Sequence, residues 1–454
     1  MPRHPLKTRE LLERVIVINL LCYKTHNKMP SRADITYFGA GPAALPTDVL
    51  EAASKALLDY NGTGLGIAEH SHRSELATNI INEAKADLAN YLEFSPENYE
   101  VIFMQAGGTG EFAASVYNLV GAWVSRQHAA LKKELGDDEE AILAALRKKV
   151  ETELKVDYIV TGGWSLKAYQ EAQRLLGPEY VNLVADARTI NDGKFGKIPD
   201  ESTWKLSKDA AYVYFCDNET VDGVEFPAFP SVLTPDANGN GPIVVADMSS
   251  NILSRRIPVN NYSLIFFGAQ KNLGSTGVTV AILKKSFLPP HVVQPSAPLL
   301  RKLGLPIPPI ILQYEIVAKN NSLYNTLSIF DVYIAGQVLK KLLNTYPDKV
   351  DGQQAVAEKK ASLIYGALEA HPDVYRVVPD KTVRSKMNIC FRVTKNGDTD
   401  ETEKSFLKAA TVLGLTGLKG HRSVGGIRAS NYNSIPLEGA EKLAKFVHDF
   451  AKAS

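Results

Sequence analysis

Two short apolar runs in the middle of the sequence each lead to a side chain that a buried strand rarely carries. Residues 243–246 read Ile-Val-Val-Ala and are followed by Asp247. Residues 264–267 read Leu-Ile-Phe-Phe and are followed, after three intervening residues, by Lys271. Continuous apolar runs bounded by turn residues predict strands of a sheet covered on both faces. Because ligands of such sheets bind outside the carboxyl ends of the strands, we expect Asp247 and Lys271 to face one ligand.

A lysine and a carboxylate at neighbouring strand ends suit the chemistry of pyridoxal phosphate (PLP). The lysine amine forms a Schiff base with the cofactor aldehyde, and the acid pairs with the pyridinium nitrogen. The alternative is that Lys271 is a surface lysine and that Asp247 caps the next turn. For an isolated Asp/Lys pair this alternative is the commoner one, since buried charges are rare unless they are paired. The rest of the sequence has to decide between the two.

A glycine turn supplies a candidate anion site. Residues 101–104 predict a buried strand, and the segment 105–111, QAGGTGE, leads into a helix expected over residues 112–124. Backbone N–H groups at a helix N-terminus bind anions. The turn does not match the dinucleotide pattern G-x-G-x-x-G, and no acidic ribose partner follows at the expected distance. A tight connection without a ligand remains the alternative.

Three further places carry residue types that could contact a ligand. Trp164 follows the expected strand 157–160 and could stack on a flat ring, although an isolated tryptophan is more often a packing residue. Thr220 follows the expected strand 211–216 and could bond a phenolic oxygen or stabilise its turn. The segment 420–430, GHRSVGGIRAS, places a His-Arg pair among glycines.

The bulk composition is that of a folded enzyme with two domains. The chain has 454 residues, of which 45% are hydrophobic and 22% charged, and its formal net charge is +1. This length exceeds one compact core, and the near-zero charge gives no field for nucleic acid or an acidic membrane. The three cysteines indicate neither a disulfide framework nor a zinc site. No apolar run approaches the roughly 18 residues that span a bilayer. The cysteines fit a reducing compartment best, and we expect a cytoplasmic protein without a metal.

The order of predicted elements separates a large from a small domain. Strands and helices alternate up to a long helix over residues 328–344, and residues 127–154 form a charged helical excursion without expected chemistry. Residues 289–309 are proline-rich and are predicted to be a loop. We expect a poorly ordered extension at 1–28, a lead-in at 29–46 that packs on the small domain, a large PLP-binding domain at 47–350, and a small α+β domain at 351–454.

The motifs together resemble one family, the phosphoserine aminotransferases, which are class V, fold-type I PLP enzymes. The matching segments run in one order over nearly the whole chain from residue 36 onward. They are FGAGPAALP at 38–46, SHR at 71–73, AGGTGEF at 106–112, DNETVDG at 217–223, VVADMSSNILSR at 244–255, FGAQKNLG at 267–274, YNT at 324–326 and GHRSVGGIRAS at 420–430. The resemblance implies an α/β fold: a large domain with a mainly parallel seven-stranded sheet between helices, and a smaller C-terminal α+β domain.

The resemblance also implies the residues that bind the cofactor. Lys271 would form the Schiff base and Asp247 would partner the pyridinium nitrogen, and both would be catalytic. Trp164 would stack on the ring, and Thr220 would reach its 3-oxygen. The cofactor phosphate would be held by Gly108, Thr109 and Gln270 and, from the partner subunit of a homodimer, by Asn325 and Thr326. Many family members carry arginine where Thr109 stands, but a backbone donor survives that change, so we expect binding to persist.

For the substrates, the resemblance implies two separate cationic sites. Arg428 would bind the α-carboxylate. The substrate phosphate would be received by His421 and Arg422 together with His72 and Arg73 of the neighbouring subunit. A phosphate and a carboxylate at opposite ends of a three-carbon chain require such separation, and the planar fork of arginine matches both groups.

The implied reaction is the reversible transfer of the amino group from L-glutamate to 3-phosphohydroxypyruvate, which gives O-phospho-L-serine and 2-oxoglutarate in L-serine biosynthesis. Two alternatives stay open at this point. Another class V enzyme, such as a serine- or alanine-type aminotransferase, would share Lys271 and Asp247 without needing the second His-Arg pair. A non-catalytic nucleotide-binding protein would use only the glycine turn.

Overall fold

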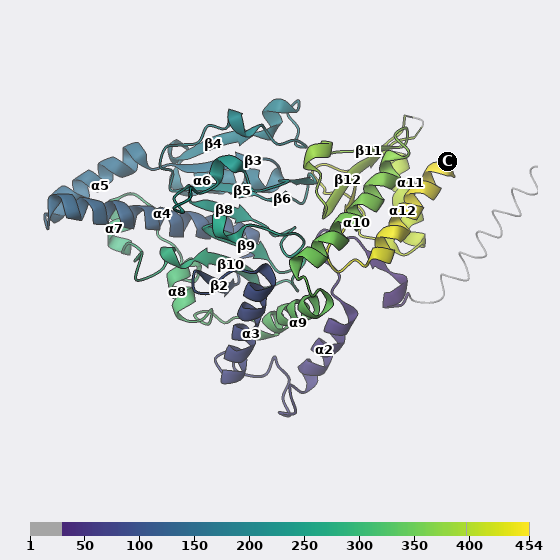
Figure 1. The fold of residues 1–454 in the computed structure, drawn as a ribbon, viewed down its shortest axis with the longest axis horizontal. Coiled ribbons are helices and arrows are strands. Elements are labelled where there is room, and N and C mark those ends of the chain that lie inside the picture. The colour runs from purple at the N-terminus through teal and green to yellow at the C-terminus, as the bar shows by residue number, and fades with distance from the viewer. Residues whose placement is uncertain (1–29, 396, 454) are drawn as a thin grey trace, which may run out of the picture.

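The computed structural model describes residues 30–395 and 397–453, and the extension predicted at 1–28 lies outside these ranges. The larger part of the fold is built on a seven-stranded sheet with the strand order β2-β10-β9-β8-β5-β3-β4. Only β10 runs antiparallel to its neighbours β2 and β9. The predicted α/β fold with a mainly parallel seven-stranded sheet is therefore confirmed (Figure 1). The strands of this sheet are β2 (Tyr99–Met104), β3 (Val156–Val160), β4 (Val181–Asp186), β5 (Tyr212–Cys216), β8 (Val244–Asp247), β9 (Leu264–Gly268) and β10 (Thr279–Lys284).

Helices cover both faces of the sheet, which explains the uninterrupted apolar strands. In β9, Ile265 and Phe267 pack into one core cluster while Leu264 and Phe266 pack into the other. Alternate residues of a strand point to opposite faces, so every residue of β9 is buried. The first cluster includes α2 (Thr47–Leu58), α3 (Glu75–Leu92) and α9 (Ile329–Thr345). The second includes α4 (Gly107–Leu135), α5 (Glu139–Glu153), α6 (Gly163–Leu176), α7 (Ala297–Lys302) and α8 (Tyr314–Lys319).

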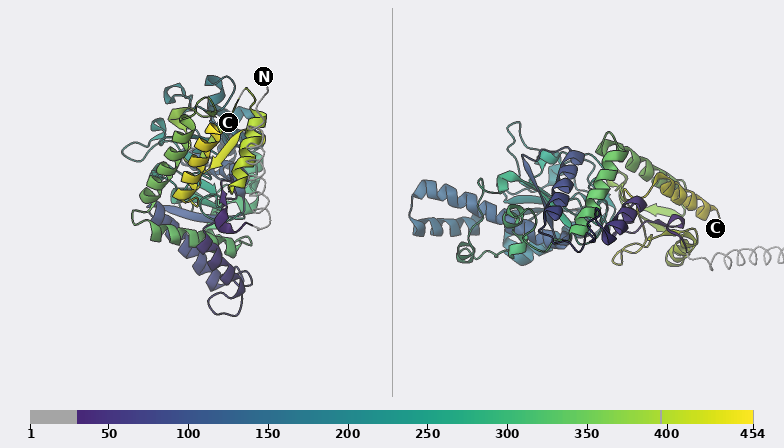
Figure 2. Two further views of the ribbon diagram at one scale, coloured as in Figure 1. Left: turned by 90° about the vertical axis from the view of Figure 1, so that its right-hand side faces the viewer. Right: turned by 90° about the horizontal axis from the view of Figure 1, so that it is seen from below.

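The charged excursion predicted at 127–154 is a helical hairpin. Helix α4 continues to Leu135, well past the end expected at residue 124, and α5 begins at Glu139. The two helices project together from the large part of the fold (Figure 2). Their shared side is apolar, because Leu131 of α4 and Ile142 and Leu146 of α5 are buried. The hairpin therefore extends the second core cluster away from the sheet.

The C-terminal part of the chain forms a smaller α+β unit around a third core cluster. Its three-stranded antiparallel sheet has the order β11-β12-β14. The N-terminal strand β1 pairs in parallel with β13, so the start of the described chain lies on this unit. The elements are α10 (Val350–Glu369), β11 (Tyr375–Val377), β12 (Asn388–Val393), α11 (Asp400–Val412), β13 (Leu415–Thr416), β14 (Ile427–Ser430) and α12 (Leu437–Lys452), with β1 at Thr36–Tyr37.

The proline-rich segment differs from the sequence expectation. The segment 289–309 is not a loop throughout, because it contains α7. The Ser296 hydroxyl accepts a hydrogen bond from the Leu299 N–H and caps this helix, and proline is compatible with a first helical turn.

A short hairpin, β6 (Asn218–Glu219) and β7 (Val224–Glu225), follows β5 at the edge facing the small unit. Among the described helices, none has the length and apolar character that a bilayer crossing requires.

Candidate active site

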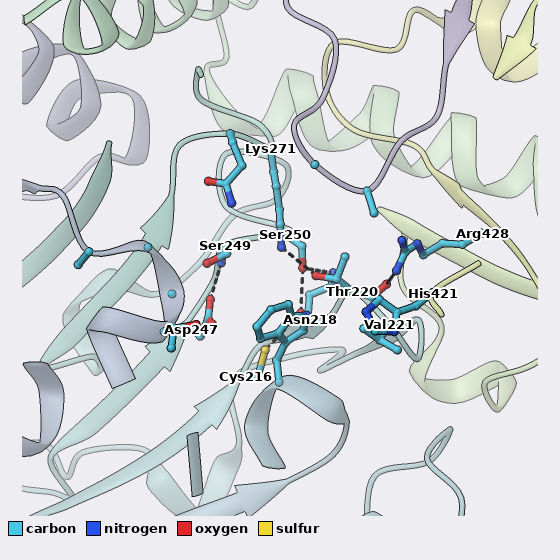
Figure 3. Close-up of a pocket in the computed structure, with 18 residues that line it drawn as sticks. Cys216, Asn218, Thr220, Val221, Asp247, Ser249, Ser250, Lys271, His421 and Arg428 are labelled. Carbon is cyan, nitrogen blue, oxygen red and sulfur yellow. Dashed lines mark hydrogen bonds between the residues drawn. The ribbon is translucent and has the colours of Figure 1, made fainter. Parts of the chain in front are cut away.

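The parallel sheet brings Asp247 and Lys271 to one cavity, as their positions after two apolar runs predicted. Asp247 is the last residue of β8 and lies opposite Phe266 of the adjacent parallel strand β9. Lys271 follows β9 in the turn that leads toward β10. Both side chains line a cavity of about 380 Å³ (Figure 3). The two residues therefore meet at the carboxyl edge of the sheet because parallel strands end on the same side.

Segments far apart in the chain form the remaining walls of this cavity. The glycine turn at the start of α4, the start of α6, the turn after β6 and the loop after β9 belong to the large part of the fold, whereas His421 and Arg428 come from the small unit. The predicted site residues that line the cavity are Gly108, Thr109, Trp164, Thr220, Asp247, Gln270, Lys271, His421 and Arg428. The cavity is thus a cleft between the two units.

Burial changes the acidity of the central pair. The Lys271 amine donates a hydrogen bond of 2.9 Å to the Thr220 hydroxyl. Desolvation lowers the pKa of Lys271, and the negative charge of Asp247 opposes this effect. Desolvation also raises the pKa of Asp247, against a hydrogen bond of 2.8 Å from the Ser249 backbone N–H and the charge of Lys271. The site therefore favours a neutral amine at lower pH than in a free lysine, which suits a proton-transfer group.

The glycine turn forms the first turn of α4. The sequence placed the helix start at residue 112, but the structure starts the helix at Gly107, whose φ of +63° suits glycine. The Gly107 N–H donates to the Thr279 hydroxyl at 2.7 Å. The N–H groups of a first helical turn have no intrahelical acceptor, and Gly108 and Thr109 border the cavity. These two residues can therefore bind an anion through their backbone.

The small unit supplies positive charge opposite this anion site. Arg428 lies on β14, and its guanidinium donates to the Thr220 carbonyl oxygen at 3.3 Å. Its Nε is buried and has no partner among the described residues. Burial lowers the pKa of His421, and the charges of Arg428, Lys167 and Arg422 lower it further. Several cations thus converge on this wall, which favours an anionic ligand.

Five predicted site residues do not line the cavity of their own chain. Arg422 is exposed beside His421. Asn325 donates from its amide to the Gln105 side-chain oxygen at 2.9 Å, on the outer side of the glycine turn. His72 is half-buried with its Nε2 unpartnered among the described residues, and Arg73 is exposed. Thr326, which follows Asn325, is exposed and also absent from the cavity wall.

Sequence reasoning missed several residues that line or support the cavity. Ser249 supplies the N–H that binds Asp247. Asn218 donates from its amide to the Ser250 hydroxyl at 2.7 Å and to the Asn388 side-chain oxygen at 2.8 Å, which links the cavity to the small unit. Asp247 at a strand end was itself a usable signal, because an aspartate side chain often accepts a hydrogen bond from the backbone N–H two residues further on. Nothing in the sequence pointed to the contact with Asn388.

Comparison with known proteins identifies the family. The model of the family described as Aminotransferase class-V matches residues 35–185 and 136–443. A phosphoserine aminotransferase of Saccharomyces cerevisiae is 43% identical over 424 residues, which cover 93% of this chain and 98% of the relative. The chain belongs to the phosphoserine aminotransferases of class V. A Drosophila melanogaster member is 38% identical over 91% of this chain and 98% of its own length.

Solved structures of the same family share this fold. The phosphoserine aminotransferase from Bacillus circulans subsp. alkalophilus superposes with a TM-score of 0.75 at 35% identity, covering 92% of this chain and 98% of that one. A PLP-bound phosphoserine aminotransferase from Trichomonas vaginalis gives 0.74 at 32% identity, covering 91% and 99%. An alanine–glyoxylate aminotransferase from Nostoc reaches a TM-score of 0.62 at 15% identity over 93% of this chain and 96% of its own, which is a likeness of fold alone. The findings therefore favour the phosphoserine family over an alanine-type class V enzyme.

Proposed function

We propose that this chain is a PLP-dependent phosphoserine aminotransferase, which reversibly transfers the amino group of L-glutamate to 3-phosphohydroxypyruvate. The products are O-phospho-L-serine and 2-oxoglutarate, in a step of L-serine biosynthesis. The observation that carries this proposal is that Lys271 and Asp247 line one cleft whose opposite wall holds Arg428 and His421. A reactive amine, its partner acid and cations for an anionic substrate are thus within one cavity.

The residues of the cleft fit the cofactor. Backbone N–H groups of Gly108 and Thr109 would hold its phosphate with Gln270, and Trp164 would stack on its ring. Gly108 leaves space next to the acid, since a Cβ atom there would lie 3.7 Å from Asp247 Oδ2. When bound, PLP supplies an aldehyde that carries the amino group and a ring that accepts electron density from the substrate carbon. Among these groups, only the Lys271 amine is placed to join the aldehyde.

Lys271 and Asp247 would divide the proton chemistry between them. Lys271, whose pKa burial lowers, would take the proton from the amino-acid α-carbon and return it during the reverse half-reaction. Asp247, whose charge the Ser249 N–H and Lys271 support, would keep the ring nitrogen protonated. Thr220 would hold the Lys271 amine through the hydrogen bond between Oγ1 and Nζ when that amine is free.

The cations of the small unit would select the substrate. Arg428 would bind the α-carboxylate that both substrates share, because its guanidinium borders the cleft next to Thr220. His421 and Arg422 would bind the distal phosphate of the keto acid or the side-chain carboxylate of glutamate. A planar guanidinium forms paired hydrogen bonds with either group, so one pocket serves two half-reactions.

We further propose a homodimer with shared active sites. His72, Arg73, Asn325 and Thr326 lie outside the cleft of their own chain, and the family resemblance assigns them to substrate and cofactor phosphates across the interface. Mixing two inactive variants, Lys271→Ala and Arg73→Ala, tests this directly. Random re-assortment should restore about one quarter of wild-type activity, since half the dimers then hold one intact site. If no activity returns although exchange of subunits is demonstrated, each chain completes its own site.

The proposed reaction is tested by the absorption spectrum of the purified protein. L-Glutamate should remove the visible band of the bound cofactor, and 3-phosphohydroxypyruvate should restore it with release of O-phospho-L-serine. A colourless protein, or a band that only alanine or serine changes, would contradict the proposal.

We also propose a cytoplasmic location, which the free thiols of Cys216 and Cys390 support. Cell fractionation with a specific antibody tests this location.

A further inference from the structure

Two buried carboxylates behind the cleft have no role in the chemistry proposed above. Glu219 of β6 is fully buried, and Asp222 is buried three residues further on. The Glu219 carboxylate accepts hydrogen bonds from the Trp164 N–H (2.9 Å), the Ser165 N–H (2.9 Å) and the Ser165 hydroxyl (2.5 Å). Asp222 Oδ2 accepts a hydrogen bond from the Gly163 N–H at 2.9 Å. Both acids therefore bind the first turn of α6.

The start of α6 is shaped to receive these acids. Its N-cap residue is Gly162, which has no side chain to bond the first-turn N–H groups. A Cβ atom at Gly162 would lie only 2.3 Å from Glu219 Cδ, so a larger residue would displace the carboxylate. First-turn N–H groups and the positive end of the helix dipole stabilise a negative group. Glu219, which belongs to a distant segment, therefore caps the N-terminus of α6 in place of a side chain at position 162.

The residues between and beside the two acids line the cleft. Thr220 and Val221 lie between Glu219 and Asp222 in the chain and border the cavity (Figure 3). Trp164 in the first turn of α6 also borders it. Thr220 also accepts hydrogen bonds from Lys271 through its hydroxyl and from Arg428 through its carbonyl. The acids therefore connect the helix that carries Trp164 to the turn that carries Thr220.

We propose that Glu219 and Asp222 are positioning residues of the active site, which hold the Trp164 indole and the Thr220 hydroxyl in register for the cofactor ring. This inference rests on the proposed function, because it concerns the same cleft. The acids do not reach the cavity wall themselves, so they act only through the residues they hold. Without them, the α6 N-terminus and the β6–β7 hairpin lose their direct hydrogen bonds.

Burial and neighbouring charges shift the pKa values of both acids and, through Glu219, that of Lys271. Burial and the neighbouring Asp222 raise the pKa of Glu219 to about 7, against the hydrogen bonds from Ser165 and Trp164. Burial raises the pKa of Asp222 to about 6, against the Gly163 N–H and the charge of Arg428. The charge of Glu219 in turn raises the pKa of Lys271. Asp247 and Cys216 raise this pKa more than Glu219 does, and the charge of Arg428 lowers it. Loss of this charge should therefore make the Lys271 amine slightly more acidic.

The substitution Glu219→Gln tests the proposal, because glutamine keeps the side-chain size but replaces one carboxylate oxygen with an NH₂ group. That group is a donor and cannot accept the hydrogen bonds that the N–H groups of α6 donate. Affinity for PLP should fall roughly tenfold or more, as expected for the loss of hydrogen bonds to a buried charged group. The pH profile of kcat should shift to lower pH, and the fluorescence of Trp164 in the cofactor-free protein should change. That emission is obtained by subtracting the spectrum of the Trp164→Phe protein, which retains Trp123 and Trp204.

A matched control lies on the same helix. Glu171→Gln removes an ion pair between Glu171 and Arg174 on the surface of α6 without touching its first turn, so PLP affinity and Trp164 emission should stay at wild-type values. Asp222→Asn removes the charge and weakens a single hydrogen bond, so it should give a smaller effect of the same kind, which keeps the test available if Glu219→Gln does not fold. Non-additive effects in the double variant would confirm one shared contact.

The outcomes separate this inference from the proposed function. If Glu219→Gln, or Asp222→Asn in its place, binds PLP and emits like wild type and Glu171→Gln, the acids do not position the site. If the wild-type protein binds PLP but transfers no nitrogen to 3-phosphohydroxypyruvate, the proposed function fails. In that case, PLP affinity and Trp164 emission still decide whether Glu219 and Asp222 position the cleft.

Discussion

The two walls of the cleft are built in different ways. The wall on the seven-stranded sheet carries Asp247 at a strand end, where the side chain is 5% exposed and bonded to a backbone N–H. The wall on the small unit carries the half-buried His421 in an irregular loop, next to Arg422, which is exposed and lies outside the cavity wall. The first wall is desolvated, whereas the loop of the second keeps its charges in contact with water.

This difference follows from what each wall has to do. Proton transfer requires shifted pKa values, and burial is what shifts those of Lys271 and Asp247. Substrate anions have to enter and leave, and cations that stay hydrated between turnovers do not need buried counter-ions. Arg428 is intermediate, because it lies on strand β14 of the small unit yet contacts Thr220 of the other wall. Together with the hydrogen bond between Asn218 and Asn388, this contact joins the two walls.

The largest effect should come from the buried wall. Lys271→Ala should lower turnover by about 10³-fold or more, because no other lysine of the described residues borders the cavity to move the proton. Single-turnover kinetics with L-glutamate measures this loss, and the borohydride-reducible visible band should disappear with it. Lys148→Ala on the exposed side of α5 is the control and should behave as wild type. A Lys271→Ala protein that keeps both turnover and the band would contradict the assigned role.

An intermediate effect is expected at the contact between the walls. Arg428→Ala should raise KM for L-glutamate and for 3-phosphohydroxypyruvate alike, by roughly 10- to 100-fold, since both carry the α-carboxylate. Arg422→Ala should raise KM for both substrates by a smaller factor that added salt reduces, and more for the phosphorylated keto acid, because its phosphate carries more negative charge than the side-chain carboxylate of glutamate. Steady-state kinetics with each substrate varied in turn separates the two patterns. Equal effects of both variants on both substrates would remove the distinction between carboxylate and phosphate sites.

The smallest effect concerns stability and a buried acid next to the cofactor wall. Burial raises the pKa of Glu111 to about 7 from 4.5, although the Tyr314 hydroxyl donates to it at 2.6 Å. Between these pH values the unfolded chain has released a proton that the folded chain retains, so this group makes stability fall as pH rises from 4.5 to 7. Glu111→Gln should flatten that decline by on the order of 2 kcal/mol.

Urea unfolding at a series of pH values from 5 to 7.5 measures the decline. The comparison variant is Glu171→Gln, whose surface carboxylate lies outside the core and should leave the slope unchanged. An identical pH dependence in wild type and Glu111→Gln would show that Glu111 ionises in the folded protein as it does in the unfolded chain.

The sequence pattern was sufficient for the buried wall because strand ends are local features. The apolar runs before Asp247 and Lys271 predicted two strands of a sheet covered on both faces, and ligands of such sheets bind outside the carboxyl ends of the strands. The glycine turn at Gly108 was likewise visible, although the helix begins five residues earlier than its apolar pattern indicated. The proline-rich segment 289–309 misled, because a serine cap and favourable first-turn positions allowed α7 to form within it.

Contacts between distant segments left no such pattern. The hydrogen bonds that Glu219 accepts from Trp164 and Ser165 join positions more than 50 residues apart, and Asn218 contacts Asn388 across 170 residues. Each of these residues also fits an ordinary turn or strand end, so its local sequence does not distinguish a capping acid from a solvated one. Only packing of the chain shows which N–H groups lack an acceptor and which carboxylate supplies it.

The amino-acid sequence by itself determined the sheet, the order of its motifs and the residues able to perform amine and acid chemistry, because periodicity and strand ends are properties of short segments. The tertiary structure alone decided which of the candidate cations share a cavity with Lys271, and how far burial alters its acidity. Those properties depend on the distances and solvent exclusion that arise when segments separated by hundreds of residues pack together.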